Sequence, residues 1–226
     1  MNLRRLIHPL IVSSALTSLV LFTLAAWAYP GGNHYDHQAI GHDFWRNALC
    51  DVARSSAVGG RPNPVGSILA RLSMSTMAIG IGALLWSLPD RFSALPRLGR
   101  AVRVLATVTV PAALAVVLLP SDRFGALHGI AVMLAGIPGA FAAAGAVYGL
   151  LQASDAPRSV AALGVATLTV TVIGLSSYGA ELVFGGPSRP EVPALERIAS
   201  LLLLAWMLAL SVSERTSRRS ACRGTR

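Results

Sequence analysis

Three residues of this chain have the types and spacing of a metal centre: Asp51, Asp122 and His128. Asp122 and His128 lie six residues apart across the expected start of a helix, so the carboxylate can fold over the first turn while the imidazole points inward. Asp51, from a separate polar segment, would close the site. Catalytic zinc takes three such ligands and keeps one position for water. Zinc here would lower the pKa of that water towards ~7 and supply a nucleophile for an ester or amide.

Other ionisable residues fall in the same polar regions. His34, His37 and His42 share a segment with Asp51 and would be spare ligands. Glu181 ends a run that is free of charge from Ser159 onward. A carboxylate in such a run is costly to expose to lipid, so we expect it to face the helix bundle or a wet cavity.

Each of these residues also has an ordinary role open to it. His34 and His37 can simply be solvated, and Asp122 can pair with Arg123 and cap the following helix. His128 can be a hydrogen-bonded residue at the membrane interface, and Glu181 can extend to the surface. The residues alone leave both interpretations open.

Six long apolar stretches must position these side chains. A helix needs about 20 mostly apolar residues to cross a membrane, and each stretch reaches or nearly reaches that length. Backbone groups in lipid must bond within their own segment, which requires helices rather than open strands. The sequence therefore predicts an all-α fold, a bundle of six transmembrane helices at approximately residues 6–29, 66–89, 103–120, 125–152, 159–184 and 193–213.

Composition indicates one membrane domain. The chain is 54% hydrophobic and only 13% charged, against about 25% charged in soluble domains. We expect a membrane domain over residues 1–213 and a basic, disordered tail over 214–226. The outer loop, 30–65, is expected to lie partly in the interface through an amphipathic segment, 43–52, anchored by Trp45. The first apolar run exceeds the length of a signal-peptide core, which favours an uncleaved first span.

The distribution of charge predicts the orientation. All nineteen basic residues are arginine, and the net charge is +9. With a cytoplasmic N-terminus, twelve arginines lie inside and seven outside, as the positive-inside rule requires. This predicts a membrane protein with both termini cytoplasmic, whose inner face contacts the bilayer's anionic lipid head groups. Because topology accounts for the basic excess, we expect no nucleic-acid partner.

Recognised catalytic patterns are missing from the sequence. There is no G-x-S-x-G nucleophile elbow and no glycine-rich phosphate loop. Cys50 and Cys222 belong to opposite faces of the membrane, so they cannot form a disulfide. Cys50 is expected to be a small packed residue rather than a reactive thiol.

Several short motifs resemble a family of six-span prokaryotic membrane proteins, domain-of-unknown-function family nine-nine-eight. The matching residues are Tyr29-Pro30-Gly31-Gly32, Asn47 with Asp51, Pro120 with Asp122 and His128, and Glu196-Arg197. Cys50 stands where the family has serine. The resemblance covers nearly the whole chain and adds Asn47 to the candidate polar residues. It implies the six-span fold and topology in a prokaryotic inner (cell) membrane, and carries over no activity.

These observations favour a non-enzymatic membrane component, such as a permease, a sensor or an assembly partner, with a polar cluster at its outer face. The alternative is a membrane-embedded, metal-dependent hydrolase acting at that face. The sequence leaves open whether the protein is an enzyme.

Overall fold

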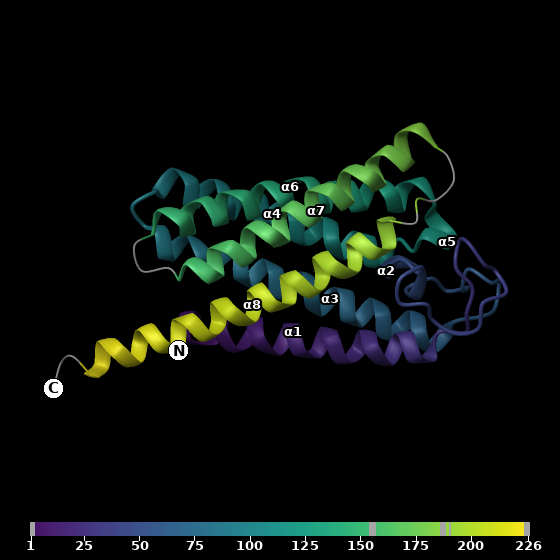
Figure 1. Ribbon diagram of the computed structural model, residues 1–226, viewed down its shortest axis with the longest axis horizontal. Coiled ribbons are helices and arrows are strands. Elements are labelled where there is room, and N and C mark those ends of the chain that lie inside the picture. The colour runs from purple at the N-terminus through teal and green to yellow at the C-terminus, as the bar shows by residue number, and fades with distance from the viewer. Residues whose placement is uncertain (1–2, 154–156, 186–188, 190, 224–226) are drawn as a thin grey trace.

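The computed structural model describes residues 3–153, 157–185, 189 and 191–223, and its elements are helices (Figure 1). The short ones are α2 (Leu49–Val52), η1 (Leu88–Phe92) and α5 (Ser121–Phe124). The long ones are α1 (Leu3–Ala28), α3 (Pro64–Ser87), α4 (Pro96–Leu118), α6 (Ala126–Gln152), α7 (Arg158–Phe184) and α8 (Glu191–Arg223). This confirms the predicted all-α bundle of six long helices.

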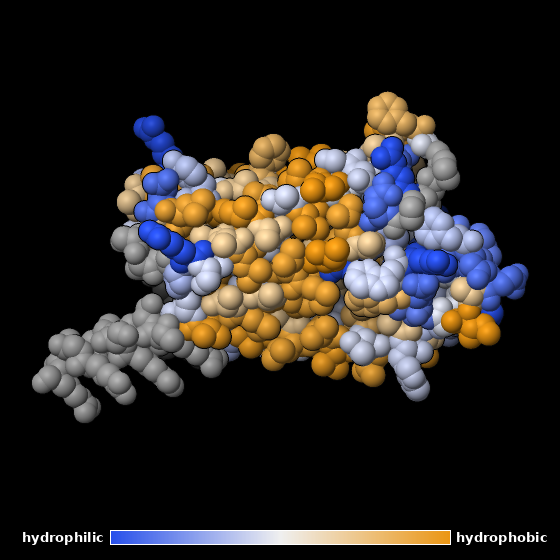
Figure 2. All heavy atoms as spheres, viewed as in Figure 1, coloured by the Kyte–Doolittle hydropathy of each residue, from blue (hydrophilic) through white to orange (hydrophobic). Residues whose placement is uncertain are grey.

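All six long helices are long and apolar enough to cross a membrane, as in a multi-pass membrane protein. The apolar spans run over Leu6–Ala28, Pro64–Phe92, Pro96–Leu118, Ala126–Gln152, Arg158–Phe184 and Glu191–Ser213. Large apolar side chains are exposed along them, and Figure 2 shows these as a hydrophobic band between two more polar ends of the molecule. A water-exposed surface would not carry such a band, whereas lipid tails would cover it.

The long helices pack in chain order. Each contacts the next, from α1 through α3, α4, α6 and α7 to α8, and α8 returns to α1. One buried apolar cluster draws on all six, with Trp206, Met207 and Leu150 almost fully enclosed. Small residues permit the helices to pack closely. For example, a Cβ on Gly164 of α7 would lie 2.9 Å from the Trp206 ring of α8. The cluster fills the half of the bundle that is nearer to both termini, here called the terminus end (Figure 1).

The opposite end is covered by a folded segment, residues 29–63, here called the cap (Figure 1). The Tyr29 hydroxyl, almost fully buried, donates to Gly32 O at 3.1 Å and accepts from Val58 N at 3.0 Å. The Asn63 side chain donates to the carbonyls of Val52 and Arg54 at 2.9 and 3.1 Å. These bonds hold the beginning and end of the cap against its middle.

The structure differs from the sequence expectations in three places. Only Leu49–Val52 of the predicted amphipathic segment is helical, because Asp43 Oδ1 accepts from the backbone N–H of Trp45 and Arg46 and holds a turn there. The third span begins at Pro96 rather than at 103. In the basic segment that was expected to be disordered, 214–223 continues α8 as helix, and 224–226 lies outside the described residues.

Substitution of Gly32 is expected to destabilise the cap. Gly32 has φ +86°, and a Cβ there would overlap the backbone of Gly59. Gly32→Ala should therefore lose about 1–2 kcal/mol from the left-handed conformation and a further ~1–3 kcal/mol from the overlap. The measurement is the thermal unfolding midpoint of the purified protein in detergent.

Gly60→Ala is the matched control. Gly60 has φ +81° but nothing lies within 4 Å of a Cβ built there, so this variant carries only the conformational strain. Equal losses in the two variants would contradict the close approach of Gly32 to Gly59.

Candidate functional site

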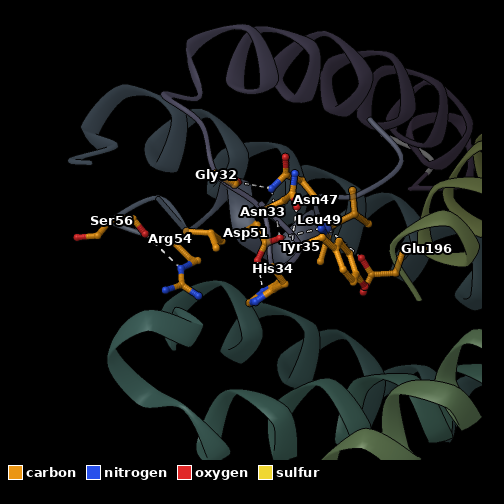
Figure 3. A network of polar contacts seen from close by, with 12 residues as sticks. Gly32, Asn33, His34, Tyr35, Asn47, Leu49, Asp51, Arg54, Ser56 and Glu196 are labelled. Carbon is orange, nitrogen blue, oxygen red and sulfur yellow. Dashed lines mark hydrogen bonds and ion pairs between the residues drawn. The ribbon is translucent and has the colours of Figure 1, made fainter. Parts of the chain in front are cut away.

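A buried asparagine positions the first histidine of the cap. Asn33 is 1% exposed, and its Oδ1 accepts from the backbone N–H of Tyr35 and Asp36, both at 2.9 Å. This local turn directs the intervening His34 towards Asp51 (Figure 3). His34 Nε2 lies 3.2 Å from Asp51 Oδ1.

Asp51 is the most enclosed acid of the cap, at 3% exposure. Its Oδ2 accepts from Ala48 N at 2.9 Å, which caps the short helix α2, and the Asn47 side chain donates to it at 3.5 Å. Asn47 also donates to Gly32 O at 2.8 Å and accepts from Asp43 N at 2.9 Å (Figure 3). Asp51 and Asn47 therefore bind three separate turns of the cap together.

The hydrogen bond that His34 makes to the Asp51 carboxylate raises the pKa of His34, although partial burial of the ring acts in the opposite direction. His34 and Asp51 therefore form a hydrogen-bonded dyad at the edge of the cap. Such a dyad can hold a proton or a polar ligand group, since the His34 side chain is 38% exposed while that of Asp51 is 4% exposed.

Arg197 of α8 fixes the cap to the bundle. This residue is 3% exposed. Its Nε donates to Phe44 O at 3.1 Å and its Nη2 to Asn47 O at 2.8 Å. The guanidinium carbon also lies over the rings of Phe22 and Phe44, 4.8 and 5.5 Å from their centroids. Nη1 is buried without a hydrogen-bond partner in the part of the chain that the structure describes.

His42 completes the arginine's surroundings. Its Nε2 lies 3.1 Å from Arg197 Nη2. Because a guanidinium only donates, Nε2 must accept with its lone pair, which requires a neutral ring. Burial, followed by the charge of Arg197, lowers the pKa of His42 to about 4. The rings of Phe22 and Tyr29 enclose it edge-on.

Glu196, the neighbour of Arg197, holds a second point of the cap. Its Oε2 accepts from Leu49 N at 2.9 Å, at the first residue of α2 (Figure 3). We call Glu196 and Arg197, with the cap groups that they bind, the clamp. Cys50 lies next to it, and burial raises the pKa of its thiol, with the nearby carboxylates adding to the effect. The thiol stays protonated, which is consistent with a packed, unreactive cysteine.

The three residues of the predicted zinc site have different partners. Asp51 pairs with His34, whereas Asp122 Oδ2 accepts from Ser56 N at 3.1 Å and so ties α5 to the cap. His128 is buried and its Nδ1 bonds to Leu119 O at 2.7 Å. Within the described residues no three His, Cys, Asp or Glu side chains gather as a metal would require. The zinc site stays a prediction.

The remaining candidates are dispersed. His37 is exposed on the cap. Glu181, near the end of α7, is half-buried and accepts from the backbone N–H of Arg189. Neither residue contacts the clamp. Of the three histidines that were expected to be spare ligands, His34 pairs with Asp51 and His42 contacts Arg197.

Sequence reasoning gave no structural role to the clamp. Glu196 and Arg197 entered only as a motif match, and the long-range bonds they make are not visible in local patterns. One feature of the sequence could have indicated the clamp: Glu196 and Arg197 are a charged pair within the first turns of an otherwise apolar helix. Such a pair requires polar groups around it. Asn33 and Asn63 carried no such signal.

Comparison with known protein families, with curated proteins and with solved structures finds no match to this chain.

Acidification is expected to weaken the cap through His42. The unfolded chain protonates this histidine near pH ~6.5, whereas the folded protein does so at about 4. Between these values the unfolded state binds more protons, so stability falls as the pH falls. His42→Gln keeps an acceptor for Arg197 without titrating. The thermal midpoint of this variant should therefore fall less than that of the wild type between about pH 7 and about pH 4.5.

His37→Gln is the control for this measurement, because His37 is exposed and belongs to the same segment. Its acid dependence should follow that of the wild type. If His42→Gln also follows the wild type, the neutral His42–Arg197 contact does not hold the cap.

Proposed function

We propose that this protein is a non-enzymatic sensor of the prokaryotic cell membrane, in which the cap receives the stimulus at the outer face and α8 transmits it to the cytoplasm. The observation that carries the proposal is the clamp. Two adjacent charged residues of α8 bond directly to the cap, so the cap cannot shift without breaking contacts of a buried charge.

The length of α8 supports transmission. The helix has 33 residues, which corresponds to about 50 Å at ~1.5 Å per residue. It begins beside the cap, passes through the bundle and continues beyond the other helices at the terminus end (Figure 1). A rigid element with one end held by the cap and the other end projecting can carry a displacement between the two faces.

The packing favours a sensor over the other non-enzymatic roles. The buried cluster at the terminus end draws on all six long helices and occupies the place where a permease would need a path. A passive assembly partner would not require a buried cation to join its cap to a membrane-spanning helix. A sensor would use both the closed packing of the helices and the attachment of the cap to α8.

The competing function is a metal-dependent hydrolase at the outer face. It would require Asp51, Asp122 and His128 to converge on one metal ion, whereas Asp51 pairs with His34 and Asp122 accepts from Ser56 N. Among the described residues no three His, Cys, Asp or Glu side chains gather in this way, so the arrangement favours the sensor.

We also propose that the chain belongs to domain-of-unknown-function family nine-nine-eight. The support is that most of the residues that carry the resemblance have structural roles at the cap end. Tyr29 and Gly32 close the cap, Asn47 and Asp51 join its turns, and Arg197 clamps it.

Arg197→Lys should alter the environment of the α8 tail. Lysine keeps the charge but cannot form both bonds to Phe44 and Asn47 or present a planar group to the rings. In a Cys50→Ser background Cys222 is the sole cysteine and can carry a spin label. We expect the spectrum of this label to change in Arg197→Lys and to stay unchanged in Arg46→Lys, which alters an exposed cap arginine.

A label away from α8 separates transmission from general loosening. Ala94 is exposed beyond η1 at the same end of the bundle, and Ala94→Cys in a chain without other cysteines reports on that region. A change at Cys222 alone supports the sensor. An unchanged Cys222 spectrum, or equal changes at both sites, rejects it.

The orientation has its own test. Alkaline phosphatase is active only outside the cytoplasm, so a fusion after Arg226 is expected to be inactive, and an insertion after Gly60 in the cap active. The physical reason is the excess of arginine on the terminus side. The reverse pattern of activity would place the cap in the cytoplasm.

A further inference from the structure

We infer that a groove between α3, η1 and α4 at the terminus end binds one phospholipid with an anionic head group. The groove has a volume of about 670 Å³. Its walls include Trp86 and Phe92 on one side and Arg100, Arg103 and Val104 on the other. The inference depends on the protein spanning a membrane and is independent of its role as a sensor.

The face of α4 that lines the groove changes character with depth. Arg100, Arg103, Val104 and Thr107 all line it, at the spacing of one helix face. α4 starts at the terminus end, so the arginines lie nearest to that surface and Thr107 lies about 10 Å deeper along the helix. A head group would therefore meet the arginines, and the attached chain would continue along Val104 and Trp86.

The two arginines are held differently. Arg103 Nη2 donates to Asp90 Oδ1 at 2.8 Å and its Nε to Trp86 O at 3.1 Å, while its guanidinium lies 5.9 Å from the centroid of the Trp86 ring. Its charge is therefore balanced by Asp90 and its position is fixed. Arg100 is exposed and has no carboxylate partner among the described residues.

This arrangement leaves one uncompensated positive charge in the groove. A phosphate bearing a single net negative charge would pair with Arg100 and accept a further hydrogen bond from Arg103 Nη1. Phosphatidylglycerol carries that charge. Phosphatidylethanolamine adds an ammonium group of its own, which removes the net attraction.

The apolar half of the groove identifies the ligand as a lipid. Trp86 is 47% exposed and Val104 57% exposed, so both offer apolar surface beside the arginines. A soluble phosphate would use the arginines alone and leave this surface uncovered. An acyl chain covers it, and basic pockets between helices near a membrane surface suit such lipids.

The test uses the full chain, purified and delipidated in detergent, and titrated with phosphatidylglycerol that carries a spin label on its acyl chain. Arg100→Gln removes the free charge, and Val104→Trp fills the apolar half without changing charge. Both should weaken binding, Arg100→Gln by about fivefold, which corresponds to ~1 kcal/mol for one basic residue at a membrane surface. Arg97→Gln is the control, since Arg97 is exposed one turn away on α4 but does not line the groove.

Each outcome decides the inference. Weaker binding in Arg100→Gln and Val104→Trp with unchanged binding in Arg97→Gln supports it, provided that labelled phosphatidylethanolamine binds less tightly to the wild type. Equal losses in Arg100→Gln and Arg97→Gln indicate diffuse attraction to the surface and overturn it. Displacement of the labelled lipid by inorganic phosphate at similar concentration would identify a soluble-anion site and also overturn it.

Discussion

A guanidinium enclosed near the start of a membrane-spanning helix must find acceptors for its donors, and the fold of the cap follows from that requirement. Arg197 takes two of its acceptors from the backbone carbonyls of Phe44 and Asn47, which can point inward only if the chain turns between them. Phe22 and Phe44 then cover its faces. Since removing one partner of a buried charge is strongly destabilising, this contact restricts the cap to a narrow range of positions.

Glu196 adds a constraint of the opposite sign. It accepts from Leu49 N while Arg197 donates to Asn47 O, so neighbouring side chains of α8 hold a donor and an acceptor only two residues apart in the cap. The Glu196 bond adds to the restraint that the two Arg197 bonds already impose on the cap. Glu196 requires a donor from the cap and Arg197 requires an acceptor. A cap shifted along α8 would bring an acceptor to Glu196 or a donor to Arg197. Buried polar bonds of this kind give a unique arrangement where apolar packing would allow several.

Long apolar runs made the six helices predictable, because length and hydropathy alone determine what can cross lipid. The start of α4 was missed since Arg97 and Arg100 interrupt the apolar run, although helix propensity tolerates arginine well. In the cap, Asn47 and Asp51 were recognised as polar candidates, but their roles depend on contacts with distant segments. Asp122 illustrates the limit: its bond to Ser56 joins residues 66 positions apart. The spacing of residues along the sequence cannot predict such a pair.

The two ends of the bundle use arginine in opposite ways, which follows from how much chain each end has available. The cap end has a segment long enough to fold around Arg197 and to present carbonyls and rings to it. At the terminus end the connections are short: η1 offers Arg103 one carboxylate, the end of α3 offers it one carbonyl, and Arg100 is left to the surroundings. A cation that the protein compensates internally stabilises one conformation, whereas a cation left exposed beside apolar surface attracts an anionic amphiphile. α3 connects the two ends, since it begins directly after the cap and its Trp86 lines the groove.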